Sequence, residues 1–201
     1  MRIGAFGGTF DPPHIAHLIL AAEALDQLDL KRILWLLTPY PPHKTRQRIT
    51  PVEQRLEMVR ATIAENEAFE LSRADIDRSP PHFTVDTMEL LAAQNPGAEL
   101  VFLMGEDSLN DLPTWHKPGE FLGAVHSLGV MHRPGREAEL AQLERWLPGI
   151  SEKVTYIRAP LLEVSASDIR QRIAEGRPYR YFLTPQVYRI ILEGGLYRED
   201  G

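Results

Sequence analysis

The feature that most constrains the fold is a regular alternation of short apolar runs with longer segments of helical periodicity. The apolar runs have the length and composition of strands, at residues 2–6, 33–37, 69–73, 99–104, 126–131 and 153–157. Helical segments follow at 14–28, 51–66, 84–94 and 136–147, with two more at 166–175 and 184–193. Strands separated by helices of about 10–15 residues indicate βαβ units. We therefore expect an α/β fold with a mainly parallel sheet.

Length and composition suit one domain. The chain has 201 residues, enough to bury a core without disulfides or a structural metal. It contains no cysteine, which excludes disulfides, thiolate metal sites and a cysteine nucleophile. Because no repeat or linker interrupts the pattern, we expect residues 1–201 to form a single domain, with 166–201 as a small C-terminal helical subregion.

The charge pattern favours small anionic ligands. The N-terminus lacks the apolar stretch of a signal peptide, and no apolar run is long enough to span a membrane, so we expect a cytoplasmic protein that binds no membrane. A net charge of −6 argues against general nucleic-acid binding. The oligomeric state is left open. Basic residues are concentrated locally instead, at Lys44, Arg46, Arg48, Arg133, Arg136, Arg170 and Arg172.

Unusual polar sequences follow the predicted strands. They are GGTFDPPH after the first strand, TPYPPHKTR after the second, GED after 99–104 and HRPG after 126–131. In open parallel sheets, ligands bind outside the carboxyl ends of the strands. Since periodicity alone placed the strands, this coincidence is an independent indication of a ligand site at that edge.

The segment from Gly7 to His17 favours phosphate chemistry. Gly7 and Gly8 predict a tight turn whose backbone can approach a ligand closely, and the next helix directs its N–H groups to the same place. His14 and His17 share one face of the first helical turn and can donate hydrogen bonds to phosphate oxygens. A purely structural turn or a metal-binding histidine pair is the alternative, although no cysteine or acidic third ligand lies nearby. The segment is not a Walker loop.

This segment resembles the (H/T)xGH signature of the nucleotidyltransferase superfamily. Its longer form, GGTFDPPHIAH, resembles the GGTFDPxHxGH of the nicotinate-nucleotide adenylyltransferases, with Ala16 in place of the family's glycine. The resemblance implies a Rossmann-like three-layer αβα sandwich and transfer of the adenylyl group of ATP to nicotinate mononucleotide, giving nicotinate adenine dinucleotide and pyrophosphate. It implies catalytic contacts of His14 and His17 with ATP phosphates. Further ATP contacts are expected from Gly7, Gly8, Thr9 and Phe10.

Three further motifs resemble the family's acceptor and phosphate elements. Pro41-Pro42-His43-Lys44 resembles the PHK loop, which implies a catalytic phosphate contact for Lys44 and acceptor binding by nearby Arg46; alone, it would be an exposed basic loop. The segment FTVDT at 83–87 resembles (Y/F)TxDT, which implies that Phe83 and Thr84 bind the acceptor, although Thr84 also suits a helix N-cap. The PTW at 113–115 implies that Trp115 stacks on the nicotinate ring; core packing is its alternative.

The remaining motifs concern ATP. Gly105-Glu106-Asp107 opens a short predicted helix and implies nucleotide contacts of Gly105 and Asp107, although Asp107 also suits a helix N-cap. The RPG turn implies a nucleotide contact of Arg133. Val164–Arg170 resembles the family's SSTxIR signature, with Ala166 replacing the second serine. Ser165 and Asp168 form a capping-box start, Ser167 keeps its hydroxyl, and Arg170 is expected to stabilise the departing pyrophosphate. Mg²⁺ is expected to arrive with ATP, with no metal site of the protein's own.

Alternative functions are separated by particular segments. A phosphopantetheine adenylyltransferase would be shorter and would lack FTVDT and PTW, and a nicotinamide-mononucleotide type would differ by one small contact. A non-catalytic nucleotide-binding regulator would be expected to lose His17, Lys44 or Arg170, and all three are present. A dehydrogenase is disfavoured because GxGxxG is absent from the first turn.

Overall fold

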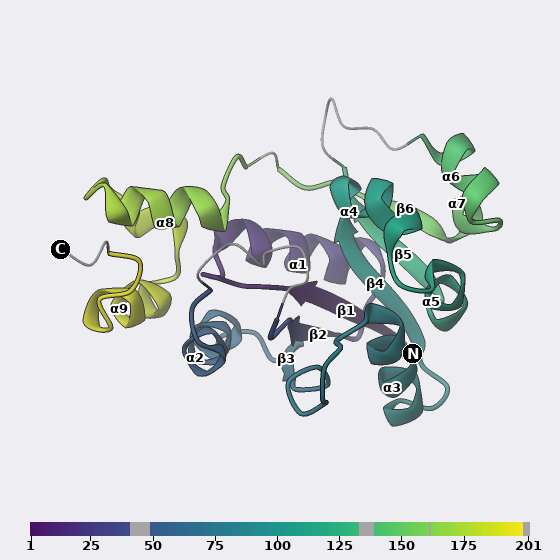
Figure 1. Cartoon of the computed structure of the whole chain (residues 1–201), viewed down its shortest axis with the longest axis horizontal. Coiled ribbons are helices and arrows are strands. Elements are labelled where there is room, and N and C mark those ends of the chain that lie inside the picture. Colours follow the sequence, from purple (N-terminus) through teal and green to yellow (C-terminus); the bar gives the residue numbers. More distant parts are fainter. Residues whose placement is uncertain (41–48, 133–138, 161, 199–201) are drawn as a thin grey trace.

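The chain forms one parallel sheet with helices on both faces (Figure 1). The computed structural model describes residues 1–40, 49–132, 139–160 and 162–198. In these residues the strand order is β3-β2-β1-β4-β5-β6, and every pairing is parallel. The α/β prediction with a mainly parallel sheet is therefore confirmed. The strands are β1 Arg2–Gly8, β2 Arg32–Leu37, β3 Phe69–Ser72, β4 Glu99–Gly105, β5 Ser127–Met131 and β6 Val154–Ile157.

Two hydrophobic cores lie on opposite faces of the sheet because successive strand residues point to opposite sides. In β2, Leu34 and Leu36 join one core, whereas Ile33, Trp35 and Leu37 join the other. The second core is covered by α1 Ile15–Gln27 and α2 Val52–Ile63. The first is covered by α3 Thr84–Gln94, α4 Glu106–Asp111, α5 Pro118–Ala124, α6 Leu140–Trp146 and α7 Ile150–Lys153. This is the expected three-layer αβα sandwich.

A third, smaller core joins the C-terminal helices to α2. α8 (Ala166–Ala174) and α9 (Pro185–Glu193) lie together at one end of the molecule in Figure 1. Met58 of α2 packs there against Ile169, Ile173, Leu183, Val187 and Ile191. The packing attaches the end of the chain beside the turn that follows β1. The treatment of 1–201 as a single domain, with 166–201 as a subregion, stays a prediction.

Several predicted boundaries were wrong for local reasons. The first strand does not turn at Gly7 and Gly8, because both residues continue the ladder opposite Leu36 and Leu37. α2 begins one residue later than predicted, after Pro51. The predicted bounds of α3, 84–94, are correct, but its N-cap is Phe83 rather than Thr84. α5 and α7 were not predicted. They have 7 and 4 residues, too few for a helical period to stand out.

Two short 3₁₀ segments, at Leu112–Thr114 and Arg180–Phe182, lead into the loop of Trp115 and into α9 respectively. Within the described ranges, no helix combines the length and the apolar character that crossing a membrane requires.

Candidate functional site

A cavity of about 750 Å³ lies where the first and last sequence motifs meet. Its walls come from the turn after β1, the start of α1, the end of β5 and the start of α8. Of the predicted site residues, the structure brings together here Thr9, Phe10, His14, His17, Ser165 and Ser167. The cavity therefore joins segments about 150 residues apart in the sequence at the expected edge of the sheet.

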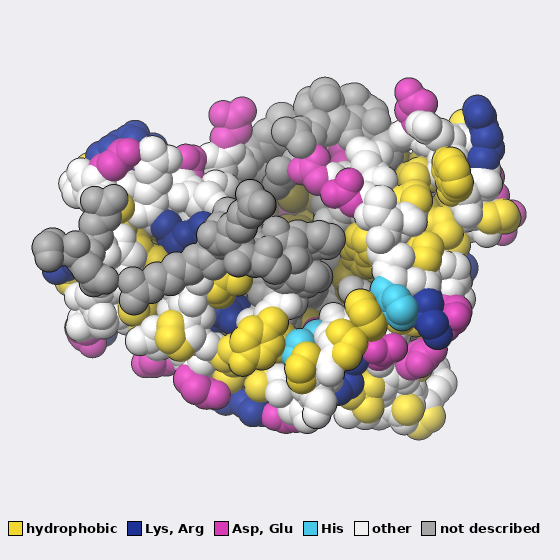
Figure 2. All heavy atoms as spheres, viewed as in Figure 1, with side chains coloured by type: hydrophobic (Ala, Val, Ile, Leu, Met, Phe, Trp, Pro, Cys, Tyr) yellow, Lys and Arg dark blue, Asp and Glu magenta, His cyan; other side chains and the backbone are white. Residues whose placement is uncertain are grey.

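Figure 2 shows acidic and basic side chains interspersed over the described part of the face that it displays. No continuous basic band of the kind that follows a nucleic-acid backbone crosses the described part of this face.

His14 and His17 form a stacked pair at the start of α1. Their ring centroids are 3.7 Å apart with an interplanar angle of 29°. His14 is the N-cap residue, only 6% exposed, and its backbone N–H donates to Nδ1 of His17 at 3.1 Å. An imidazole nitrogen that accepts an N–H carries no proton, so neutral His17 has its proton on Nε2. The fold thereby makes Nε2 the donor of this ring.

Phe10 packs against the ring of His17. Its ring is 2% exposed and packs edge-on against the His17 ring, at 5.1 Å between centroids, within a cluster that includes Phe6 and Trp35. The side chain thus belongs to the core, and only part of the residue lines the cavity. A Cβ on Gly8 would lie 2.8 Å from the Phe10 ring. The glycine is therefore needed to admit Phe10, and the contact of Gly8 with ATP stays a prediction.

The start of α8 is tied to the turn after β1 through Arg170. The Ser165 hydroxyl oxygen accepts the backbone N–H of Asp168 at 3.0 Å, which confirms the predicted cap on that side. Arg170 donates from Nη2 to the Ser167 hydroxyl at 3.2 Å and from Nη1 to the Asp11 carbonyl oxygen at 2.7 Å. One guanidinium therefore bridges the two signature motifs.

Asp11 is a buried carboxylate that sequence reasoning missed. It is 3% exposed, and its two oxygens accept hydrogen bonds from the Tyr197 hydroxyl at 2.7 Å and from the Thr50 N–H at 3.2 Å. Burial, together with the nearby Asp11 charge, raises the pKa of the Tyr197 hydroxyl, so it remains a donor at any ordinary pH. No local pattern could have revealed Tyr197, since its partner lies 186 residues away.

Arg55 is a second residue that sequence reasoning missed. It is 1% exposed, and its guanidinium donates to four backbone carbonyl oxygens at 2.7–2.9 Å, those of Thr9, Thr38, Pro39 and Thr50. Burial lowers the pKa of the Arg55 guanidinium, against the opposing attraction of Asp11. The sequence did carry a signal for this residue, because Arg55 occupies a position on the apolar face of α2, where a charged side chain is unusual.

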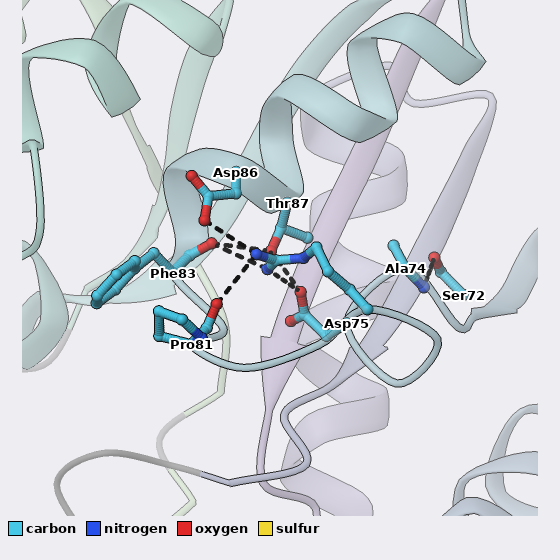
Figure 3. A network of polar contacts seen from close by, with 8 residues as sticks. Ser72, Ala74, Asp75, Pro81, Phe83, Asp86 and Thr87 are labelled. Atoms are coloured by element: carbon cyan, nitrogen blue, oxygen red, sulfur yellow. Dashed lines mark hydrogen bonds and ion pairs between the residues drawn. The ribbon is translucent and has the colours of Figure 1, made fainter.

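A polar network fixes the start of α3, where acceptor contacts are predicted (Figure 3). Arg78 donates to Asp75 at 3.1 Å, to Asp86 at 2.9 Å and to the Thr87 hydroxyl at 3.0 Å. It also reaches the carbonyl oxygen of Phe83 at 3.3 Å, and the Thr87 hydroxyl donates to Asp75. A cation at the positive N-terminal end of a helix is unfavourable, and here the two carboxylates balance the charge of Arg78. The network was not visible from sequence because its members lie in a loop and a helix.

Of the predicted acceptor residues, those that the structure describes lie beside this network: Phe83, Thr84 and Trp115. Phe83 stacks on His116 with ring centroids 3.8 Å apart, and His116 directly follows Trp115. Trp115 is half-buried and packs against Phe102 and Phe121, so the core-packing alternative holds for part of its ring. Thr84 is the first residue of α3, so it is not the N-cap. His116 was missed.

The ends of β4 and β5 are linked by Glu106, for which the sequence predicts no role. Glu106 is fully buried, and its Oε1 lies 3.3 Å from Nδ1 of His132. Gly105 is the N-cap of α4, which places Asp107 in the first turn. Asp107 is thus not the cap itself.

Lys44, Arg46 and Arg133 lie outside the described residues. Among the residues that are described, no group of three or more His, Asp and Glu side chains is arranged to hold a metal ion.

Comparison with known proteins gives consistent results. A cytidylyltransferase-like family model matches residues 5–172. A relative from Thermomicrobium roseum, named "Probable nicotinate-nucleotide adenylyltransferase", is 45% identical and is aligned over 98% of this chain and 92% of its own. One of the same name from Exiguobacterium sibiricum is 40% identical, over 98% and 99%.

A solved structure shares the fold. Plasmodium falciparum nicotinic acid mononucleotide adenylyltransferase complexed with NaAD superposes with a TM-score of 0.80 at 18% identity, covering 98% of this chain and 97% of that one. On the sequence matches, the chain belongs to the cytidylyltransferase-like family and, within it, to the nicotinate-nucleotide adenylyltransferases.

Proposed function

We propose that this chain transfers the adenylyl group of ATP to nicotinate mononucleotide, forming nicotinate adenine dinucleotide and pyrophosphate. The observation that carries the proposal is the cavity in which the His14–His17 pair faces the start of α8. Names of the full-length relatives support the choice of acceptor.

In this reaction an oxygen of the acceptor's 5′-phosphate attacks the α-phosphorus of ATP. A P–O bond forms to the acceptor, the bond between the α-phosphorus and the bridging oxygen to the β-phosphate breaks, and pyrophosphate leaves with that electron pair. No covalent enzyme intermediate is required, because two bound reactants can be aligned directly. The protein's task is to position the reactants and to stabilise moving charge.

His17 is suited to donate to a phosphate oxygen. Its Nδ1 is occupied by the His14 N–H, so the proton lies on Nε2 without any rearrangement of the ring. Preorganised donors of this kind stabilise charge that develops on phosphate oxygens. His14, stacked on the same ring, is the second proposed phosphate contact.

Pyrophosphate is proposed to leave toward the start of α8. Ser165, Ser167 and the first-turn N–H groups of α8 form an anion-binding helix start, and Arg170 is held beside them by Asp11 and Ser167. Lys44 is proposed from its motif alone as a further phosphate contact. Gly7, Gly8, Thr9, Gly105, Asp107 and Arg133 remain proposed ATP contacts.

The acceptor is proposed to bind at the start of α3. Thr84 and the N–H groups of the first turn suit a pyridine carboxylate, and Phe83 and Trp115 offer aromatic surface. Arg46 remains a proposed acceptor contact from its motif. ATP is taken as its Mg²⁺ complex, with the ion held by the triphosphate, as is usual for Mg²⁺ that a nucleotide carries in.

Pyrophosphate release tests the proposal. The purified chain is given ATP and Mg²⁺ with nicotinate mononucleotide, nicotinamide mononucleotide or phosphopantetheine, each in parallel with His17→Ala. We expect release with nicotinate mononucleotide, at least about 100-fold slower in the variant, as for loss of an electrostatic donor.

Preference for phosphopantetheine would overturn the acceptor while keeping the reaction class. Preference for the amide would place the chain with the nicotinamide-mononucleotide type. Measurable ATP binding without release for any acceptor would overturn catalysis and support a nucleotide-binding regulator.

A further inference from the structure

We propose that Tyr197 is a positioning residue for adenylyl transfer, because its hydroxyl fixes Asp11, whose carbonyl oxygen holds Arg170 beside α8. The proposal rests on the proposed function of the same site. It concerns the far end of the chain, which no motif connects to catalysis.

The first step is the contact between Tyr197 and Asp11. The tyrosine hydroxyl donates to Oδ1 of Asp11 at 2.7 Å, and the Thr50 N–H donates to Oδ2 at 3.2 Å. The carboxylate is otherwise surrounded by protein, with 3% exposure. Tyr197 and Thr50 are the donors that the described residues supply to this carboxylate. A buried carboxylate that loses such a donor is left under-solvated, so the turn that carries it would shift.

The second step is the position of Tyr197 itself. Its backbone is left-handed, with φ of 64°, a conformation that side chains rarely adopt without support. Gly195, two residues earlier, is also left-handed, with φ of 58°, which turns the chain back after α9. The half-buried ring packs with the C-terminal core. The end of the chain is thus folded back to place this hydroxyl.

The third step is the link from Asp11 to the site. Asp11 uses its side chain toward Tyr197 and its main-chain oxygen toward Nη1 of Arg170, at 2.7 Å. Arg170 reaches the Ser167 hydroxyl with Nη2 at 3.2 Å. Movement of Asp11 therefore changes where the guanidinium lies relative to the α8 start, the place proposed for pyrophosphate.

The test is Tyr197→Phe, which keeps the ring and removes the hydroxyl. We expect kcat to fall by about tenfold, comparable to one hydrogen bond to a charged group, with the KM for nicotinate mononucleotide changed less than about twofold. Tyr181→Phe is the matched control, since Tyr181 is 89% exposed, and it should behave as the unaltered chain. Thermal unfolding of each variant ensures that folded protein is compared.

A double-mutant cycle separates positioning from general stability. If Tyr197 acts through Asp11, the effect of Tyr197→Phe on kcat should shrink to less than about twofold in an Asp11→Ala background, which removes the acceptor. The same reduction is expected with Arg170→Lys, whose single ammonium cannot bridge Asp11 and Ser167 with a planar fork. If the Asp11→Ala variant does not fold, the result in the Arg170→Lys background decides between the two outcomes.

An unchanged kcat in Tyr197→Phe, or an equal tenfold loss in both backgrounds, would overturn the positioning role while leaving the proposed function standing. Failure of the proposed function would instead show as absence of transfer by the unaltered chain.

Discussion

Replacement of Arg55 by methionine is expected to destabilise the fold more than any exposed substitution on α2. The guanidinium is 1% exposed and donates to the carbonyl oxygens of Thr9, Thr38, Pro39 and Thr50. These acceptors lie on both sides of the segment 41–48 and in the turn after β1. The methionine side chain fills much of the volume but offers no donor.

The expected loss is about 3–5 kcal/mol in the free energy of unfolding. This is the range for removal of one partner of a buried charged network. In this variant the buried carboxylate of Asp11 also loses the attraction of the nearby Arg55 charge. For a chain of 201 residues, such a loss lowers Tm by roughly 6–20 °C. Arg55→Lys should lose less, because its ammonium retains three donors.

Urea denaturation followed by circular dichroism measures the effect. Arg60→Met is the matched control, since Arg60 is exposed on the same helix and should change the free energy by less than about 0.5 kcal/mol. A loss of less than about 1 kcal/mol for Arg55→Met would refute the view that this guanidinium holds together the turn after β1 and the residues on both sides of segment 41–48.

Three further outcomes are expected. Gly8→Ala should cost about 1–3 kcal/mol because its Cβ would lie 2.8 Å from Phe10, whereas Gly123→Ala, in open space in α5, should be neutral or stabilising; chemical denaturation compares them, and equal effects would contradict the packing argument. Arg78→Leu should raise the KM for nicotinate mononucleotide by about tenfold and that for ATP by less than about twofold in steady-state kinetics, and a reversed pattern would contradict the placement of the acceptor. Because the pKa of Tyr197 is raised in the folded chain, only the unfolded chain releases this proton just above pH 10. The free energy of unfolding should therefore fall there by up to about 1.4 kcal/mol per pH unit. Tyr197→Phe should remove that part of the slope, and an identical slope in the variant would contradict the linkage.

The fold was predictable where local patterns were strong. Continuous apolar runs such as 33–37 could only be buried strands in an alternating chain, and the parallel sheet followed from the helices between them. The predicted ends of strands and helices were wrong where a residue suits two conformations. The Gly7-Gly8 pair is typical of a turn, yet both residues continue the strand opposite Leu36 and Leu37. At Gly8, the close approach of the Phe10 ring needs a residue without a Cβ.

The candidate site was predictable to the extent that motifs follow strands. The structure brings His14, His17, Ser165 and Ser167 to one cavity, and their contacts with ATP stay a prediction. Arg55, on the apolar face of α2, carried a sequence signal that was overlooked. Other supporting residues could not be predicted from the sequence, because they act through partners far away in the chain. Asp11, for example, is held by a tyrosine 186 residues distant.

Transfer of an isotopic label tests the central claim most directly. ATP labelled at the α-phosphate is incubated with Mg²⁺, nicotinate mononucleotide and the purified chain, and the products are separated. We expect the label to move into nicotinate adenine dinucleotide while the pyrophosphate formed is unlabelled. Label that remains in ATP, or leaves as adenosine monophosphate without forming the dinucleotide, would contradict the proposed transfer.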